Sequence, residues 1–536
     1  MHACLRVDEI LRLLAWEVVW SGARANAVAL ACCSKNFEGP ALDALWEQQY
    51  CLLSLLKSLP GDVWNGDGCN VSTPATRVFF FLNYLDRQSF KRFPTTREWA
   101  RFRKYARRMR RLAAAGDPRT TPIEIFGALW YCGINEPLFP NLGSLELWDT
   151  VGEFIPFVPS LLSPRIIDID IEFSEYADLP NEAIASMVTT FPTLCPNLQK
   201  IRLRFLPRDP IIVAAVSGFL LAANRDALRH FHVESPLTEE AREVICKLPG
   251  LRGLTVVVEG STSLPTMALP NLTQIDVEYD DNCDWLDGFR KATLERLNSV
   301  AFHTKSEFAQ VSDFFGAFKS IGLPTSTTLS SFSFCTPHPW RPNYRSLLSF
   351  KQLRELEIGF SCDDGCSSTI DDDIITDIAQ AMPMLDSLRL GEEPCQTPTG
   401  ATAKGLAVLA HRCPNLTFLN IHFRADSFNP LPTIAGTHYT RSAVPRKDCV
   451  LSYLEVGQIP ILEESVLMVA LTLTRLFPNI IDINYTEENW AEVSEAMQLS
   501  KLFVDRSSKE YSLGSLITLR SNLNHTSPGA TLESGS

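Results

Sequence analysis

A few residues have types and spacings that could do chemistry. His230 and His232 alternate along the chain and are followed by Glu234, a set that could hold a metal ion. A half-exposed strand offers no third fixed ligand, so we expect no metal site there. Cys362 and Cys366 have no further Cys or His at zinc-like spacing. Because the sequence also lacks the GxGxxG, GxxxxGKS/T, GxSxG and HExxH motifs, we expect no catalytic residue and no cofactor.

The overall composition limits the class of partner and the compartment. The 536 residues carry a formal net charge of -13, which argues against a nucleic-acid binder because such proteins need a basic face. The 15 cysteines are scattered and form no CxxC pair, so we interpret them as core residues in a reducing compartment. The sequence shows no signal peptide and no membrane-length apolar run, so we expect a cytoplasmic or nuclear protein without a membrane partner.

A repeated pattern indicates the elements that would carry a binding surface. The order apolar-x-x-apolar-x-apolar recurs from about residue 142 to 485, with successive starts 21 to 35 residues apart. The starts are Leu142, Ile166, Leu198, Leu228, Leu251, Leu272, Leu297, Leu329, Leu353, Leu385, Leu416, Leu451 and Ile480.

Proline marks the same point in many of these units. In eight of the thirteen it stands two residues before the first apolar position, and five of these read Pro-Asn. Because proline cannot continue a helix, it marks a junction from helix end to strand start. Apolar residues at helical spacing precede several junctions, as at 210–224, 239–248, 367–385 and 402–412. The sequence therefore predicts an α/β leucine-rich-repeat solenoid with a parallel inner sheet and outer helices.

The units depart from the usual repeat at one position. The Asn or Cys that commonly follows the last apolar strand residue by three positions is absent in all thirteen. We therefore expect that the usual ladder of side chains cannot form. The solenoid should be irregular, with helices of variable length.

The segment before the repeats indicates a small helical module. Residues 5–49 read as three short helices, with a break at Ser21 and Gly22. A unit of this size buries little surface and rarely stands alone. We expect its spare apolar surface to dock on something else.

This module resembles an F-box. The matching stretches are 9–14 (EILRLL), 29–35 (ALACCSK) and 40–46 (PALDALW). With 52–60 (LLSLLKSLP) and 105–112 (YARRMRRL), the chain resembles the large set of fungal, basidiomycete-type F-box/leucine-rich-repeat proteins over nearly its whole length. The order of F-box first and repeats second is more specific than the F-box motif by itself.

The resemblance implies a role in ubiquitylation. F-box helices dock on the Skp-type adaptor of a cullin–RING ubiquitin ligase, and the repeats bind the substrate protein. The docking residues would be Val7, Ile10, Leu11 and Leu14, with Trp46 packing the third helix. The proline usual before the first helix is missing, since Val7 and Asp8 stand there. The alternative is a ligase-independent scaffold in which the same helices only cap the solenoid.

A basic segment follows the module. Between Arg87 and Arg111 there are eleven Arg or Lys residues and one acid, Glu98. The sequence predicts an amphipathic helix with a Thr95–Glu98 capping box and an apolar stripe running on to Met109 and Ala113. It is either a solvated linker helix or a nuclear-import or phosphate-binding patch. The patch residues would be Arg103, Lys104, Arg107, Arg108, Arg110 and Arg111.

Alternation along each strand predicts which side chains lie on the inner, concave face. The predicted face includes eleven acids and four Arg or Lys, so we expect it to prefer a basic partner segment. Aromatic residues are the predicted anchors. The candidate partner-binding residues are Trp148, Asp168, Asp170, Arg202, Arg204, His232, Asp276, Glu278, Glu357, Arg389, Phe418, His422 and Tyr453.

Some of these charges have a second interpretation. The strand with Asp168, Asp170 and Glu172 directly precedes the strand with Lys200, Arg202 and Arg204. Because adjacent parallel strands lie about 4.8 Å apart, the six charges can pair with one another across the sheet.

We divide the chain into four parts. Residues 1–50 form the F-box-like docking module, 51–135 a helical linker with the basic helix, 136–500 the solenoid, and 505–536 a disordered tail. Two long loops, 336–344 and 424–447, interrupt the repeats. The predicted function is a non-catalytic adaptor that brings a substrate protein to a ubiquitin ligase.

Overall fold

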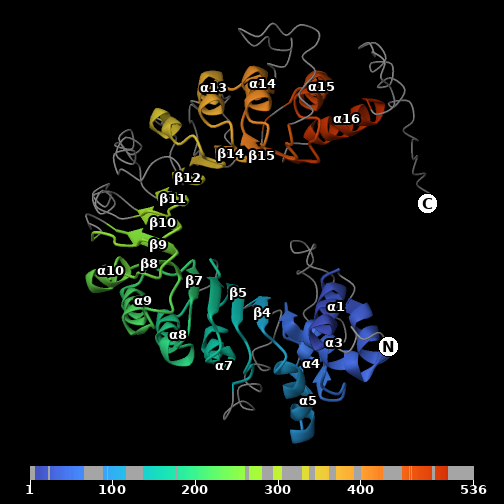
Figure 1. Ribbon diagram of the computed structural model, residues 1–536, viewed down its shortest axis with the longest axis vertical. Helices are drawn as coiled ribbons and strands as arrows, with labels where there is room; N and C mark the ends of the chain where they lie inside the picture. Colours follow the sequence, from blue (N-terminus) through green and yellow to red (C-terminus); the bar gives the residue numbers. More distant parts are fainter. Residues whose placement is uncertain are drawn as a thin grey trace, which may run out of the picture. The chain divides into compact units, whose positions relative to one another are not determined.

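The computed structural model divides into two compact units (Figure 1). The first comprises Met1–His338 and Pro342–Gln352, and the second comprises Pro339–Arg341 and Leu353–Ser536. Residues described are 7–21, 24–65, 89–92, 94–115, 137–175, 179–259, 265–279, 294–304, 329–336, 344–360, 370–391, 400–425, 449–457, 459, 461–485 and 489–504. The predicted tail, most of the two predicted loops, Cys362 and Cys366 lie outside these ranges.

The first unit contains a parallel sheet in the order β1-β4-β5-β6-β7-β8-β9-β10-β11-β12. A separate short antiparallel pair joins β2 (Trp64–Asn65) to β3 (Ser89–Phe90). The sheet strands are β1 (Gln48–Gln49), β4 (Arg111–Ala115), β5 (Ser144–Thr150), β6 (Asp168–Phe173), β7 (Lys200–Arg204), β8 (His230–Pro236), β9 (Gly253–Val258), β10 (Gln274–Tyr279), β11 (Ser299–Thr304) and β12 (Ser331–Thr336).

Helices of the first unit precede the sheet or lie along one side of it, where α7, α8, α9 and α10 follow one another (Figure 1). They are α1 (Asp8–Trp20), α2 (Arg24–Cys33), α3 (Lys35–Glu47), α4 (Leu53–Leu56), α5 (Thr96–Ala106), η3 (Ile155–Phe157), α7 (Val158–Leu161), α8 (Asn181–Leu194), α9 (Pro210–Ala222), α10 (Glu239–Ile245) and η6 (Tyr344–Ser349).

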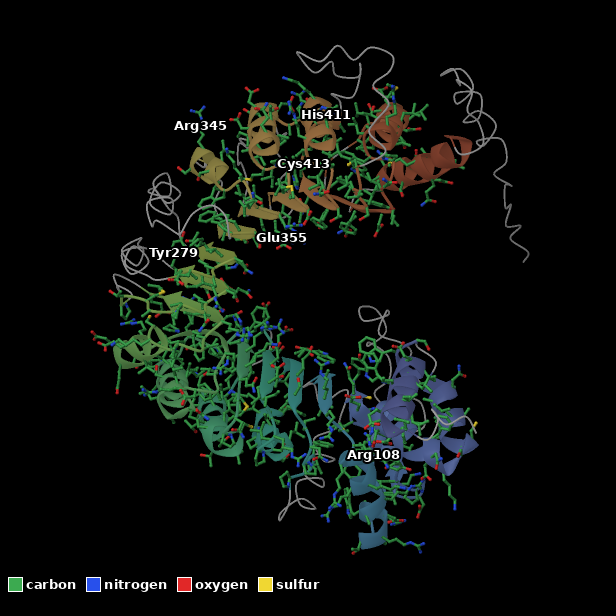
Figure 2. All side chains as sticks on the ribbon, in the orientation of Figure 1. Arg108, Tyr279, Arg345, Glu355, His411 and Cys413 are labelled. Carbon is green, nitrogen blue, oxygen red and sulfur yellow. The ribbon has the colours of Figure 1, made fainter. Side chains whose placement is uncertain are left out.

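The second unit repeats the arrangement in the order β13-β14-β15-β16-β17, again with parallel strands. Its strands are β13 (Glu355–Phe360), β14 (Ser387–Leu390), β15 (Phe418–Ile421), β16 (Tyr453–Gly457) and β17 (Asp482–Tyr485). Its helices are α13 (Asp372–Ala381), α14 (Ala403–Arg412), η8 (Glu463–Ser465), α15 (Val466–Leu476) and α16 (Asn489–Val504). Figure 2 shows Glu355 on the sheet side of this unit and His411 on the helix side.

The predicted repeat register is confirmed in all thirteen units. Each strand from β5 to β17, named in sequence order, begins two residues after a predicted start. The start residues themselves are buried, as Leu142, Leu251 and Leu416 illustrate at 0% exposure. Burial then alternates along strands such as β7, β8 and β10, so one row of side chains faces the core and the other faces out. The predicted α/β solenoid fold is therefore present.

The sheet begins earlier in the chain than the predicted boundary at residue 136. Strand β4 pairs with β5, and β1 pairs with β4, so the segment predicted as a helical linker supplies sheet strands. Met109 occupies the start position of this added unit and is fully buried. Its three alanines in β4 are too small and too weakly apolar to stand out in the sequence pattern.

The predicted amphipathic helix is correspondingly too long. Helix α5 ends at Ala106, so Met109 and Ala113 are not helical. The physical reason is the pairing of β4 with β5, whose hydrogen bonds hold residues 111–115 extended. The apolar spacing of Trp99, Phe102 and Ala106 correctly predicted a helix, and that helix ends at Ala106.

Two sets of polar side chains join neighbouring units, at positions other than that of the usual ladder, which the sequence predicts to be missing. The first uses the Pro-Asn junctions. The amide nitrogens of Asn141, Asn271 and Asn479 donate to the carbonyl oxygens of Arg107, Pro249 and Cys449, at 2.6, 2.8 and 2.6 Å. Each acceptor lies at the junction position of the preceding unit, so the asparagine ladder precedes the strands instead of following them.

The second ladder uses hydroxyl groups one residue after the start position. Thr273, Thr417 and Ser452 each donate from the side chain to the equivalent carbonyl oxygen of the preceding unit, at 2.9, 2.9 and 3.2 Å. The same carbonyl oxygens also accept backbone N–H groups of the following unit, so the hydroxyl contacts add to the backbone bonds that fix the spacing between units.

A half-buried carboxylate, that of Asp372, joins two helices of the second unit. Asp372 Oδ1 accepts from the backbone N–H groups of Thr402 and Gly405, at 2.8 and 3.0 Å. Asp372 Oδ2 accepts from the Thr402 hydroxyl at 2.6 Å. The carboxylate of α13 therefore caps the N-terminus of α14, where unsatisfied N–H groups favour a negative charge.

Replacing Asp372 with alanine should destabilise the second unit. We expect Asp372→Ala to lower the free energy of unfolding by about 2 kcal/mol, because three hydrogen bonds to a charged group are lost. Urea denaturation followed by circular dichroism measures the change. Asp373→Ala is the matched control, because Asp373 lies in the same helical turn and is exposed. Equal losses in the two variants would contradict this role of Asp372.

Candidate functional site

The outer face of α1 is apolar and exposed. Helix α1 packs inward through Leu11 and Ala15, which are 4% and 0% exposed. We name the α1 face the surface formed by Val7, Ile10, Leu13, Leu14, Trp16 and Trp20. Val18 and Val19 of the same helix are half-buried and are not counted in it. Leu13 and Trp20 are 64% and 63% exposed, and the Trp16 and Trp20 rings lie 5.0 Å apart. Such an apolar surface indicates a protein contact.

The predicted docking residues on α1 and just before it differ in their exposure to solvent. Val7 and Leu14 are exposed and Ile10 is half-buried, so all three contribute to the α1 face. Leu11 is buried inside the module and cannot contact a partner, which corrects its predicted role. The sequence missed Leu13, Trp16 and Trp20, because a short helix that is apolar nearly all round does not show which side packs.

The third helix fixes the module to the sheet. Trp46 packs on Tyr105 of α5, with ring centroids 4.9 Å apart, as predicted for a packing residue. The N–H of Arg110 donates to the Glu47 carbonyl at 2.9 Å, and β1 begins at the next residue. The α1 face is thus held by direct packing and strand pairing.

The predicted basic patch is partly structural. Arg108 forms an ion pair with Asp43 and donates to the Gly39 carbonyl oxygen at 3.2 Å, so it joins α3 to the turn after α5. Figure 2 labels Arg108 within this region. Lys104 lies 3.9 Å from Glu38. Exposed members of the patch are Arg103, Lys104, Arg107, Arg110 and Arg111, of which Arg111 belongs to β4.

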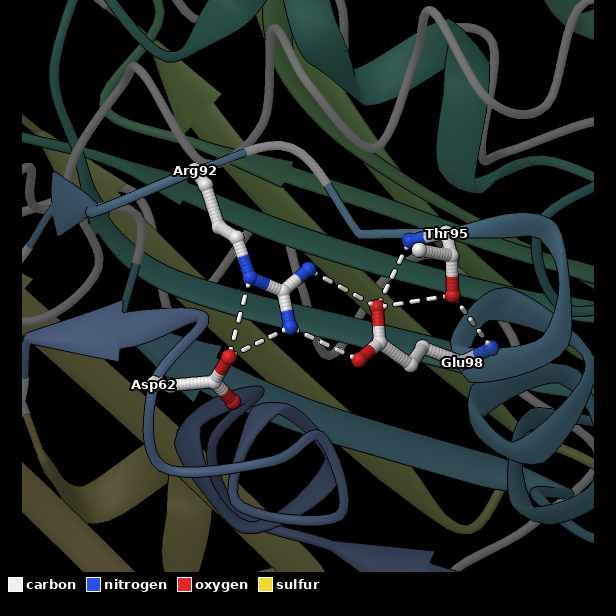
Figure 3. Close-up of polar contacts among 4 residues, drawn as sticks. All are labelled: Asp62, Arg92, Thr95 and Glu98. Carbon is white, nitrogen blue, oxygen red and sulfur yellow. Dashed lines mark hydrogen bonds and ion pairs between the residues drawn. The ribbon is translucent and has the colours of Figure 1, made fainter.

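The predicted capping box is present at the start of α5 (Figure 3). The Thr95 N–H donates to Glu98 Oε2 at 2.6 Å, and the Glu98 N–H donates to the Thr95 hydroxyl at 3.4 Å. Arg92 donates to Glu98 at 2.8 Å and to Asp62 at 2.7 Å. Hydrogen bonding from Arg92, with a smaller contribution from the Thr95 N–H, lowers the pKa of Glu98 to about 2. Arg92 and Glu98 therefore fix the position of α5.

On the inner face of the first unit, the predicted charge pairing is confirmed. Lys200 lies 3.4 Å from Asp168, and Arg202 lies 2.8 Å from Asp170. Arg204 bridges Asp170 and Glu172 at 3.3 and 2.6 Å. Asp170 is buried by these contacts. The charges of β6 and β7 are thus largely compensated within the sheet.

The histidines of β8 lie over the small residues of β9. A Cβ on Gly253 would come within 2.6 Å of His230 and 2.8 Å of His232, so a larger residue there would force the imidazole rings to shift. His232 is hydrogen-bonded to Thr255 at 2.9 Å. Burial, with Arg202 as the next cause, lowers the pKa of His232 to about 4. His232 is therefore neutral at pH 7. In its predicted role as a partner-binding residue it would act as an uncharged polar side chain.

Three carboxylates follow on β8 and β10. Glu234 accepts from the Phe205 N–H at 2.7 Å, and Arg208 contacts Glu278 at 2.6 Å. Asp276 lies 3.4 Å from His303. Burial raises the pKa of Glu234 and of Asp276. The predicted site residues Asp276 and Glu278 are thus engaged by side chains of the same unit.

In the second unit, three predicted partner-binding residues come together. The Phe418 and Tyr453 rings stack with centroids 5.1 Å apart and planes at 12°. The Arg389 guanidinium lies over the Phe418 ring, 4.5 Å from its centroid, and 3.5 Å from Glu357. We name Arg389, Phe418 and Tyr453 the aromatic column. Stacking across neighbouring strands positions it.

Two other predicted residues lie differently. His422 is buried directly after the end of β15 at Ile421, so its side chain is not an exposed member of the inner face. Trp148 is half-buried near an irregularity of β5, where the register shifts between Leu147 and Thr150 and Asp149 has a φ of 50°.

Three observations on the described residues concern metal ligands, thiols and membrane-spanning helices. Among them, no group of three or more His, Cys, Asp or Glu is arranged to hold a metal ion. Burial raises the pKa of the Cys195 and Cys413 thiols to about 12, so neither is a thiolate at neutral pH. The same part of the chain contains no helix long and apolar enough to cross a membrane.

Comparison with known proteins gives only distant likeness. No family model matches the chain, and no curated protein matches it. Rad7, in a crystal structure with Elc1 from yeast, is 12% identical with a TM-score of 0.36, covering 66% of this chain and 76% of its own. The leucine-rich-repeat protein LegL7 of Legionella pneumophila is 10% identical with a TM-score of 0.28, covering 70% and 94%.

A third solved structure, from Bacteroides fragilis, is 9% identical with a TM-score of 0.26, covering 67% of this chain and 69% of that one. Likeness at this level adds no argument about function. Function has to be argued from the surfaces of this chain itself.

Proposed function

We propose that this protein is the substrate-recognition subunit of a Skp–cullin–F-box ubiquitin ligase. Its N-terminal helices bind a Skp-type adaptor, and its repeats bind the protein to be ubiquitylated. The α1 face is the observation that carries the proposal. A helix that packs through Leu11 and Ala15 while leaving Leu13 and Trp20 largely in water has a second apolar side available for a partner.

The construction of the module supports an adaptor role. Helix α3 runs into β1, and the Arg110 N–H bonds back to Glu47, so the α1 face is fixed to the first repeat strands. A rigid connection limits where bound substrate can lie relative to a ligase. The protein then contributes proximity, by raising the effective concentration of the substrate beside the ligase, and contributes no catalytic residue.

A ligase-independent scaffold is the second candidate. The observation that favours it is the packing of α3, since Trp46, Asp43 and Glu47 join the module to α5 and the first strands as a cap would. In that case the α1 face would bind another component of an assembly.

Co-expression with a Skp-type adaptor tests the proposal. We expect the full chain and the adaptor to elute as a stoichiometric complex from gel filtration, and the complex to capture a cullin. Failure of the folded full chain to form this complex would exclude the ligase role and leave the scaffold.

A further inference from the structure

The inner face of the second unit carries two parallel rows of side chains. Strand register places Phe418, Tyr453 and Asp482 in one row, with Ser387 before them. The second row runs through Glu357, Arg389, Asn420, Glu455 and Asn484.

One end of the aromatic column already holds a cation. Ser387, the neighbour of Phe418 in its row, is too short to cover the ring. The Arg389 guanidinium reaches across from the second row and lies over the Phe418 ring, with Glu357 3.5 Å away. The chain itself thus shows how this face binds a guanidinium, between a ring and a carboxylate.

The other end of the column has the same surroundings without such a cation among the described residues. Asp482 is the neighbour of Tyr453 in its row, is exposed, and is too short to cover the ring. Glu455 lies on the same strand as Tyr453 and accepts from Asn484 at 3.3 Å. Burial, followed by the nearby charges of Glu455 and Asp482, raises the pKa of Tyr453, as expected in a negative surrounding.

The charges of the described face favour a basic ligand. Its two rows, the first extended to Glu355 beside Ser387, contain four acids and one cation. The cation, Arg389, is already paired with Glu357. The acids are Glu355, Glu357, Glu455 and Asp482. The first unit is different, because its Asp168, Asp170 and Glu172 are compensated by β7. The second unit therefore offers a basic ligand acids that are less compensated than those of β6.

We propose that the open face of Tyr453, with Asp482 and Glu455 beside it, binds an arginine or lysine side chain of an extended basic segment of a partner protein. The bound cation repeats at Tyr453 what Arg389 does at Phe418. This inference rests on the proposed function in one respect, since it names the class of substrate segment that the repeats would recognise.

Fluorescence anisotropy with a labelled peptide of repeated Gly-Ser-Arg tests the proposal on the full chain without any adaptor. We expect this peptide to bind at least about fivefold more tightly than the same peptide with citrulline, which keeps the shape and removes the charge. A peptide with Glu in place of Arg should bind more weakly still. Equal binding of the Arg and citrulline peptides would overturn the proposal.

Variants locate the binding. We expect Asp482→Asn and Tyr453→Leu each to weaken the Arg peptide about threefold to fivefold, and Tyr453→Phe to retain most of the affinity because the ring remains. Glu492→Gln is the matched control, since Glu492 is an exposed acid on α16 of the same unit. Equal weakening by Glu492→Gln would mean general attraction to an acidic protein and would overturn the site.

The peptide assay and the adaptor assay fail separately. If the adaptor complex forms and the Arg peptide does not bind, the inference is wrong and the ligase role remains. If the peptide binds at Tyr453 and no adaptor complex forms, the site remains and belongs to a scaffold. Because Asp482→Asn changes an exposed side chain, its result does not depend on whether Tyr453→Leu folds.

Discussion

In a Leu13→Asp/Leu14→Asp variant, we expect the affinity for a Skp-type adaptor to fall about 30-fold or more. The two side chains are 64% and 42% exposed, so the module should stay folded while its contact surface acquires two charges. Truncation of central apolar residues in an interface commonly costs about 2 kcal/mol, and a buried carboxylate adds a desolvation cost. Isothermal titration calorimetry with the purified adaptor measures the affinity.

Leu462→Asp is the control for this variant. Leu462 is 62% exposed and lies in the second unit, so it matches Leu13 in residue type and exposure at a site outside the α1 face. We expect its affinity for the adaptor to equal that of the wild type. A wild-type affinity in the Leu13/Leu14 variant, with circular dichroism unchanged, would mean that α1 does not bind the adaptor.

The second large effect concerns the end of the second unit. Trp490, in α16, is fully buried, and its indole N–H donates to the Ile459 carbonyl at 2.8 Å. Its ring lies edge-on to Phe423, with centroids 6.0 Å apart. We expect Trp490→Ala to lower the free energy of unfolding by about 4 kcal/mol, because a large cavity is created and the Ile459 carbonyl loses its donor.

Guanidinium denaturation followed by tryptophan fluorescence and circular dichroism measures this loss, and hydrogen exchange locates it. Trp490→Phe separates the contributions, since it keeps an aromatic ring and should lose about 1 to 2 kcal/mol. Leu499→Ala, at a site 37% exposed on the same helix, should change stability by less than about 1 kcal/mol. A loss of similar size in Leu499→Ala and Trp490→Ala would argue against a packing role for Trp490.

The repeat register could be predicted because it depends on local chemistry. A start residue such as Leu251 must be apolar to fill the core between sheet and helices, and proline before it must end a helix. The apolar start recurs in all thirteen units and the proline in eight of them, so thirteen strands were placed correctly from spacing by itself. Strand β4 was missed because Ala114, which pairs with Leu147, fills a core-facing position with little apolar surface.

The ladders between units could not be predicted in the same way. Asn271 and Thr273 are polar residues at loop positions, and their types fit turns and helix caps as well as a bond to the preceding unit. Their partners, the carbonyl oxygens of Pro249 and Arg252, lie 22 and 21 residues earlier in the chain. Only the stacking of one repeat unit on the next brings each pair within hydrogen-bond distance.

The sequence by itself determined the α/β repeat class and the helical module before it. These follow from residue type and period, which act over a few residues. The tertiary structure decided that Leu11 is buried while Leu13 is exposed, and that Arg389 lies on Phe418 beside Tyr453. The reason is that exposure and stacking depend on which neighbour occupies the adjacent strand or helix, and the spacing of residues along one strand does not contain that information.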